Sequence, residues 1–202
     1  MDKNQFSYKT VAMKSEAKYV DRGSKFLAFV KNVNTQEDIK IFIKTLKEQH
    51  PKAVHHCYAY RLGIGKNNFR ANDDGEPSDS AGKPILTQID SYELTNVLIV
   101  VVRYFGGVLL GIPGLVQAYK SAAKMAILNN QIIEKQITKI YTLTFDYTIL
   151  NEVMRIVKSS SCEILENNQS LFCELKIAIP ISNLESILMR FQEFVQLKID
   201  AE

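Results

Sequence analysis

The feature that most limits the fold of this sequence is an unbroken run of aliphatic residues, residues 97–102. A strand that faces water on one side alternates between apolar and polar side chains, whereas a strand buried on both faces does not. We therefore expect a central buried strand over residues 96–105. The run is too short to cross a bilayer, which takes about 20 apolar residues.

Further strands are expected before this central strand. Segments rich in β-branched and aromatic residues predict strands over residues 6–16, 24–33 and 53–62, the first two joined by a turn at residues 21–23. Residues 63–82 are rich in Gly, Asn, Asp and Ser and predict a loop. Loops of this length are usually either functional or disordered.

Three helices are expected in the same half of the chain. The first begins after Thr35, a suitable N-cap, and ends before Pro51, with apolar residues at helical spacing between them. A short helix is predicted over residues 84–92, and an alanine-rich helix over residues 115–128. Strands and helices thus alternate through this part of the chain.

The pattern changes after residues 129–130, where alternating strand-like residues begin again. The order there is strand, helix, strand, strand, helix, with a turn at residues 167–168 and a final strand at residues 197–199. This is the order of a small ferredoxin-like sandwich. The sequence therefore predicts an α+β protein with domains 1–134 and 135–202, and function is expected in the first, because the second contains no clustered chemistry.

Charge and cysteine content restrict the partners and the compartment. Residues 1–134 contain 18 basic and 13 acidic side chains, against 7 and 9 in residues 135–202. A modest basic excess suits an anionic partner such as RNA but is also common on solvated surfaces. The three cysteines form no CxxC pair, and the first nine residues lack an apolar run, so we predict a cytoplasmic protein that does not contact a membrane.

The first candidate site lies on the strand over residues 53–62 and consists of His55, His56 and Cys57. Side chains alternate along a strand, so the two histidines should point to opposite faces. His55 and Cys57 share a face, with Cα atoms about 6.5 to 7 Å apart, within reach of a nucleophilic pair. A buried thiol beside hydrogen-bonded histidines explains the same residues and is the favoured interpretation.

The second candidate site is the polar loop with its four carboxylates, Asp73, Asp74, Glu76 and Asp79. Carboxylate oxygens can hold Mg²⁺ or Ca²⁺, although the spacing does not fit an EF-hand. Acidic turn-forming residues in a solvated loop explain the composition equally well.

The third candidate site is the glycine-rich turn that starts with Arg103 and Tyr104 and continues through Gly106 and Gly107. It lies between a buried strand and a helix, where free N–H groups favour an anion. It matches neither of the common phosphate-binding loops. Glycines that allow close strand–helix packing are the alternative explanation.

Three motifs in this order resemble the YigZ/Impact family: HHCYAYRLG at residues 55–63, NDDGEPSDSAGKPIL at residues 72–86 and RYFGGVLLG at residues 103–111. The resemblance implies an N-terminal domain like domain 2 of ribosomal protein S5 and a ferredoxin-like C-terminal domain like domain V of elongation factor G. It also implies a binding protein linked to translational control, with no established catalytic activity.

The resemblance carries a set of binding residues onto this chain. The matching positions are Arg61, Asp73, Asp74, Glu76, Ser78, Lys83, Arg103, Tyr104, Gly106 and Gly107. Leu109 and Gln117 stand where the family commonly has Lys and Arg. Losing two cations weakens the case for phosphate contacts, because each such contact supplies salt-dependent affinity.

Together these observations predict a noncatalytic, translation-linked protein that binds RNA, the ribosome or a translation factor through its first domain. We expect Arg61, Lys83, Arg103 and Tyr104 to converge on one face, and we assign no catalytic residue, cofactor or metal. One alternative is a metal- or anion-dependent hydrolase or phosphotransferase that uses the acidic loop and the glycine-rich turn. Another is a module that binds only proteins.

Overall fold

The computed structural model describes residues 5–65 and 67–202 and contains both helices and strands, as an α+β protein should. The chain forms two compact units, Tyr8–Lys135 and Gln136–Glu202, with the segment that ends at Ser7 joining the second. Within the described residues, no helix is both long and apolar enough to cross a membrane.

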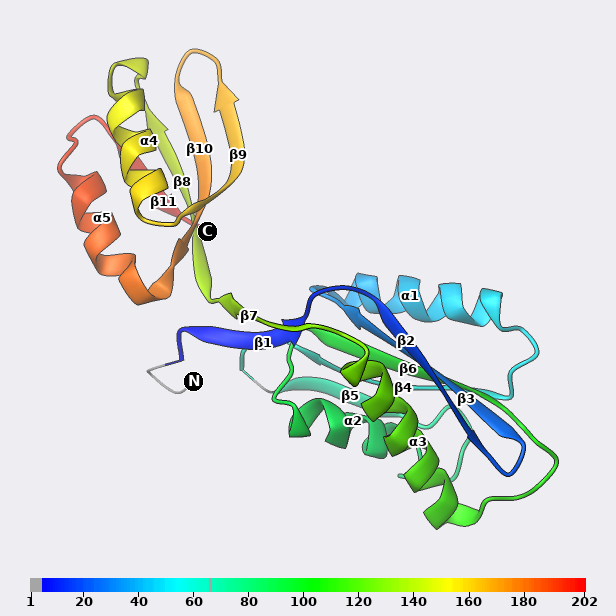
Figure 1. The fold of residues 1–202 in the computed structure, drawn as a ribbon. Coiled ribbons are helices and arrows are strands. Elements are labelled where there is room, and N and C mark those ends of the chain that lie inside the picture. The colour runs from blue at the N-terminus through cyan, green and yellow to red at the C-terminus, as the bar shows by residue number, and fades with distance from the viewer. Residues whose placement is uncertain (1–4, 66) are drawn as a thin grey trace. The chain divides into compact units, whose positions relative to one another are not determined.

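The first unit is built on a five-stranded antiparallel sheet with the strand order β2-β3-β6-β4-β5 (Figure 1). The strands are β2 (Ser15–Asp21), β3 (Ser24–Asn32), β4 (His55–Leu62), β5 (Asn68–Asn72) and β6 (Val97–Tyr104). The central strand β6 is buried along seven of its eight residues, as the unbroken aliphatic run predicts. It therefore lies between two hydrophobic cores.

Helices cover both faces of this sheet (Figure 1). One face packs against α1 (Gln36–Gln49), whose N-cap Thr35 forms a capping box with Asp38. The other face packs against α2 (Gly82–Ser91) and α3 (Gly111–Leu128). Odd-numbered residues of β4 and β6 point to the α2/α3 face, so the two faces carry separate sets of side chains.

Three expectations for the first unit are wrong in detail. The strand predicted over residues 6–16 is divided into β1 (Ser7–Val11), which pairs with β7 (Ile132–Gln136), and β2. The side-chain amide of Asn130 donates to Met13 O and Ser15 Oγ where the chain bends. The loop predicted over residues 63–82 contains β5, whose mostly exposed side chains give no hydrophobic pattern. Helix α3 begins four residues earlier than expected, at Gly111.

The second unit has the predicted order of elements. Its sheet has the strand order β11-β8-β10-β9 and is antiparallel throughout. The elements are β8 (Thr138–Phe145), α4 (Leu150–Ser159), β9 (Glu163–Gln169), β10 (Cys173–Pro180), α5 (Leu184–Gln192) and β11 (Lys198–Ala201). The turn predicted at residues 167–168 is wrong, because both asparagines lie within β9 and pair with β10. All residues of this edge strand are exposed, so a hydrophobic pattern does not show that it extends to Gln169.

Candidate functional site

The site begins where β4 and β6 lie side by side, with His55 directly opposite Arg103. Both side chains point to the α2/α3 face of the sheet, because each belongs to the odd-numbered set. His56 points to the other face, as predicted, and its ring is buried there. Burial lowers the pKa of His56, since a charged imidazole loses its hydration in an apolar environment. The two histidines therefore act separately.

The acidic loop is held in place by its own carboxylates. Asp73 accepts three backbone hydrogen bonds, from Asp79 at 3.0 Å, Ala81 at 3.0 Å and Gly82 at 2.8 Å. The last two lie at the start of α2, so this carboxylate also satisfies free N–H groups of the helix. Asp74 accepts a hydrogen bond from the backbone N–H of His56 at 2.7 Å and lies 3.4 Å from Lys47 Nζ. This loop is thus ordered by internal hydrogen bonds.

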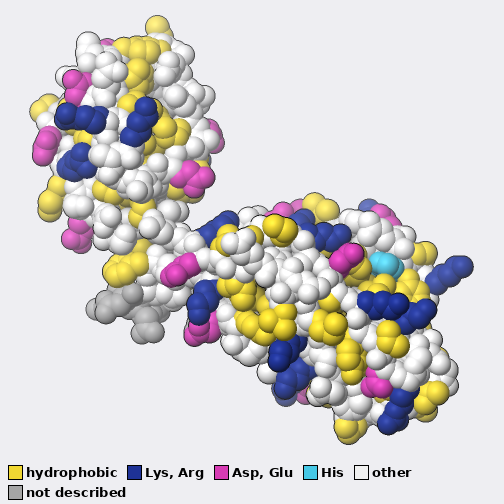
Figure 2. Space-filling model, in the orientation of Figure 1, with side chains coloured by type: hydrophobic (Ala, Val, Ile, Leu, Met, Phe, Trp, Pro, Cys, Tyr) yellow, Lys and Arg dark blue, Asp and Glu magenta, His cyan; other side chains and the backbone are white. Residues whose placement is uncertain are grey.

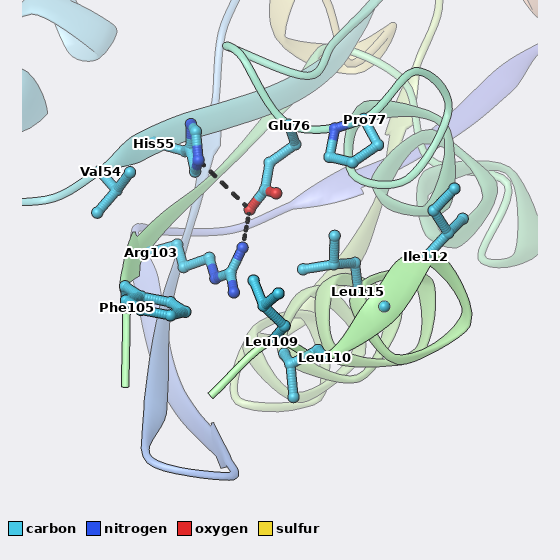
Figure 3. A pocket seen from close by; sticks show the side chains of 11 residues that line it. Val54, His55, Glu76, Pro77, Arg103, Phe105, Leu109, Leu110, Ile112 and Leu115 are labelled. Atoms are coloured by element: carbon cyan, nitrogen blue, oxygen red, sulfur yellow. Dashed lines mark hydrogen bonds and ion pairs between the residues drawn. The ribbon is translucent and has the colours of Figure 1, made fainter. Parts of the chain in front are cut away.

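Glu76 is the centre of a buried polar network (Figure 3). Its Oε1 atom accepts hydrogen bonds from Arg103 Nη1 at 2.5 Å and from Tyr119 Oη at 2.7 Å. His55 Nε2 lies 3.9 Å from the same oxygen. His55 Nδ1 lies 2.8 Å from the carbonyl oxygen of Asp74, and a carbonyl can only accept, so Nδ1 carries the proton. In neutral His55, the Nε2 atom is therefore an acceptor.

Cys57 extends this network into the core without being reactive. Its thiol donates to Asp73 O at 3.0 Å and lies 3.3 Å from Tyr119 Oη. Burial raises the pKa of Cys57 far above its usual value, and burial together with Cys57 and Glu76 raises that of Tyr119. Both groups therefore stay protonated at neutral pH. This supports the buried-thiol interpretation over a nucleophilic pair, because the nucleophile would be the thiolate.

Arg103 is enclosed by aromatic rings but is not fully satisfied. Its Cζ atom lies 5.4 Å from the ring centre of Phe26 and 5.8 Å from that of Phe105. Its side chain is 7% exposed, and the described residues provide no hydrogen-bond acceptor for its buried Nε atom. Its second terminal nitrogen points away from Glu76, toward the side where Leu109 lies (Figure 3). The guanidinium can therefore donate further hydrogen bonds besides the one to Glu76.

A cavity of about 360 Å³ opens above this network (Figure 3). The polar residues His55, Glu76 and Arg103 line it together with apolar residues. The apolar lining consists of Val54, Pro77, Phe105, Leu109, Leu110, Gly111, Ile112 and Leu115. Ligand sites are usually cavities of this kind, mostly apolar with a few converging polar groups. The cavity is therefore the candidate functional site.

The glycine-rich turn shapes one side of the cavity. A Cβ atom on Gly106 would lie 2.0 Å from the backbone carbon of Gly23, so only glycine allows this close approach to the β2–β3 turn. Its N–H also donates to Ser24 Oγ at 3.1 Å. Gly107 has a φ of +86°, which favours glycine for conformational reasons. Close packing accounts for Gly106 and backbone conformation for Gly107.

The structure does not show the convergence that was expected for four residues, Arg61, Lys83, Arg103 and Tyr104. Arg61 is six residues from His55 along β4, about 20 Å away at the usual rise per residue, and pairs with Asp90. Tyr104 points to the α1 face, where its hydroxyl lies 2.9 Å from His50 Nδ1.

Lys83 also lies apart from the network, as an exposed side chain that pairs with Asp79 at 3.5 Å. Ser78 is exposed as well. On the face shown in Figure 2, lysine and arginine side chains form several separate groups among hydrophobic ones. The basic residues singled out in the sequence are therefore distributed over the first unit, and their role in binding stays a prediction.

The carboxylates of the acidic loop do not form a cation site. Asp73 is occupied by backbone N–H groups and Glu76 by Arg103 and Tyr119. Among residues 5–65 and 67–202, no three acidic, histidine or cysteine side chains are placed to hold a metal ion. The hydrolase or phosphotransferase alternative stays a prediction.

The sequence singled out His55, Cys57, Glu76 and Arg103, and also Leu109 as a departure from the family pattern, but not Tyr119 or the rest of the apolar lining. Tyr119 lies in an alanine-rich helix, where a buried tyrosine has the same spacing as a core residue. The apolar lining residues were missed because isolated exposed hydrophobic residues are common. Leu109, an apolar residue in a turn, is a signal in the sequence that could have indicated the apolar rim of the cavity.

The chain is similar in sequence to a family model and to known proteins. Residues 22–127 match the family model described as the Impact N-terminal domain. The chain is 34% identical to the IMPACT family member YvyE of Bacillus subtilis, over 81% of this chain and 76% of the relative. It is 30% identical to the IMPACT family member YigZ of Escherichia coli, over 85% of each.

A solved structure of a hypothetical protein is similar along the whole chain. It matches with a TM-score of 0.75 and 28% sequence identity, and the match covers 98% of each chain. The matched family region, residues 22–127, contains every residue that lines the cavity. By these similarities, and by the three motifs that surround the buried Glu76–Arg103 pair, this chain belongs to the IMPACT family.

Proposed function

We propose that this chain is a noncatalytic, translation-linked regulatory protein that acts in the cytoplasm and binds a polypeptide of the translation apparatus through its first unit. The single observation that carries the proposal is the cavity around Arg103, with its buried polar floor and its exposed apolar rim. The link to translation rests on what resemblance to the IMPACT family implies.

The rim favours a polypeptide over RNA as the partner. Leu109 is 82% exposed, Ile112 56% and Val54 55%, and all three line the same cavity. Neighbouring apolar side chains exposed in this way are typical of protein-binding surfaces. RNA binding would instead depend on free cations, yet Arg61, Lys83 and Arg103 each pair with a carboxylate.

Sedimentation with purified bacterial ribosomes, and pull-down with purified translation factors, tests the proposal. We expect the full chain to bind one of these components, with an affinity that changes little between low and moderate salt. A double variant, Leu109→Ser with Ile112→Ser, should lose at least about tenfold in affinity, since central apolar contacts carry most of the energy of an interface.

Leu171→Ser is the matched control, because Leu171 is an equally exposed leucine of the second unit, 88% exposed. It should bind like the natural protein. Absence of binding to every component would refute the proposal. Binding that falls by orders of magnitude with salt and ignores the rim variants would instead assign RNA as the partner.

A further inference from the structure

The cavity is small for a ligand site. Its volume of about 360 Å³ is near the lower end of the usual range of about 300 to 1,000 Å³. A small group, such as one side chain with its adjoining peptide unit, suits this size. The cavity is also open to solvent on the side of the exposed Leu109 and Ile112, so such a group could enter without opening the fold.

The floor of the cavity is nearly neutral in charge. The Arg103 guanidinium is balanced by the Glu76 carboxylate, and both side chains are almost fully buried. No lysine is found among the described residues that line the cavity, and Leu109 lies at its mouth. An anionic ligand would be repelled by the Glu76 carboxylate, because Arg103 is already paired and the described lining has no lysine to balance the added charge. A neutral ligand is therefore favoured.

The floor nevertheless offers one donor and one acceptor. Arg103 has donor capacity beyond its bond to Glu76, and the described residues leave its Nε atom without an acceptor. Where His55 is neutral, its Nε2 atom is an acceptor on the same floor, because its Nδ1 atom donates to Asp74 O. An extended residue has the matching pair on one side of its backbone, a carbonyl that accepts from Arg103 and an N–H that donates to His55.

We propose that the cavity binds an apolar side chain of the partner polypeptide together with its neutral peptide group, rather than a carboxylate or a phosphate. This inference rests on the proposed function, in that it names the part of the polypeptide that the site recognises. The apolar side chain contacts the lining from Phe105 to Leu115, and the backbone N–H and C=O of the same residue lie over His55 and Arg103.

Nuclear magnetic resonance titration of the full chain with three small probes tests this inference. The probes are N-acetyl-leucinamide, N-acetyl-leucine and inorganic phosphate, which differ in charge and in apolar content. We expect N-acetyl-leucinamide to bind with a Kd in the range of about 1 to 10 mM, as suits a fragment of about a dozen heavy atoms. It should bind at least about fivefold more tightly than the other two and shift the amide signals of residues 103–115.

The variant Leu109→Lys places a cation at the mouth of the cavity on a residue that is 82% exposed, so the fold should be unchanged. It should reverse the preference, so that N-acetyl-leucine binds more tightly than N-acetyl-leucinamide. Leu171→Lys is the control and should leave the order of the probes as it is. Equal or weaker binding of the neutral amide to the natural protein would overturn the inference.

The two proposals fail separately. If sedimentation is sensitive to the rim variants while the neutral amide does not bind at the cavity, the docking surface stands and its recognition chemistry is wrong. If the amide binds at residues 103–115 while no translation component is retained, the cavity assignment stands and the link to translation falls.

Discussion

The two units differ in what they bury. Among the described residues, all eight buried polar or charged side chains belong to the first unit: Thr10, Ser24, His56, Glu76, Ser80, Gln88, Thr95 and Arg103. The core of the second unit is formed by aliphatic and aromatic residues with Cys173. Its ion pairs are at the surface, for example Lys176 with Glu202 at 2.7 Å.

This difference means that the cores of the two units differ in their free-energy cost. Burying a polar group costs free energy unless its hydrogen bonds are satisfied, and an apolar core of the same volume avoids the cost. The first unit bears this cost around Glu76, next to its cavity. The comparison predicts that equivalent substitutions have different effects in the two units.

The largest difference is expected for ion pairs. Arg103→Met should destabilise the first unit by about 3 to 5 kcal/mol, because it leaves the Glu76 carboxylate buried without a cation. Lys176→Met in the second unit should cost at most about 1 kcal/mol, because Lys176 is 28% and Glu202 42% exposed, so water can solvate the carboxylate that is left. Urea unfolding followed through amide signals of each unit gives both values.

A second variant separates the unpaired charge from the lost side chain. Arg103→Met with Glu76→Gln removes both charges and should recover part of the stability that the single substitution loses. If Arg103→Met costs no more than Lys176→Met, the contrast between the two units is wrong.

Tyrosine hydroxyl groups should show a smaller difference. Tyr119→Phe removes the donor at 2.7 Å from Glu76 and should cost about 1 to 3 kcal/mol, because a buried acceptor loses a partner. Tyr147 donates to Ser170 O at 3.0 Å but is 43% exposed. Tyr147→Phe should change the free energy of unfolding by less than about 0.5 kcal/mol, since water replaces the lost bond. Equal costs in thermal unfolding would contradict the assignment of Tyr119 to the network.

The smallest difference concerns pH. Burial holds the pKa of His56 below its usual value, so the folded first unit keeps this ring neutral, whereas the unfolded chain binds a proton near pH 6.5. The unfolded state then binds more protons, and stability should fall as the pH falls below about 6.5. All three histidines precede residue 57, so the second unit should lack this histidine-dependent decrease.

The variant His56→Phe identifies the group responsible. It should flatten the decrease in the free energy of unfolding of the first unit between about pH 6.5 and 5. An unchanged slope in this variant would assign the pH dependence to other groups. Hydrogen exchange measured at several pH values reports on each unit of the same sample.

Most of the fold could be predicted because hydrophobic periodicity records which face of an element is buried. The run at residues 97–102, the Thr35 cap and the order of elements in the second unit were all confirmed. Strand β5 and the full length of β9 were not predicted, because edge strands are held by backbone hydrogen bonds, which leave little trace in side-chain type. The likeness to ribosomal protein S5 stays a prediction.

The site was harder to predict than the fold. The sequence indicated Glu76 and Arg103 as separate candidates. Their contact depends on two tertiary features, the pairing of β4 with β6 and the position of the loop that carries Glu76. Arg61 and Arg103 looked equivalent as cations near motifs. They differ because they lie at opposite ends of the paired strands β4 and β6. The sequence near each residue does not reveal this pairing.

The three hydrogen bonds accepted by Asp73 have a consequence for the speed of binding. A loop that is already fastened to the start of α2 loses little conformational freedom when a partner arrives. Association then needs no slow ordering step, so its rate constant should fall in the range of about 10⁵ to 10⁷ M⁻¹s⁻¹ that is typical of preformed protein surfaces. Differences in affinity between variants of this surface should then appear mainly in the dissociation rate constant.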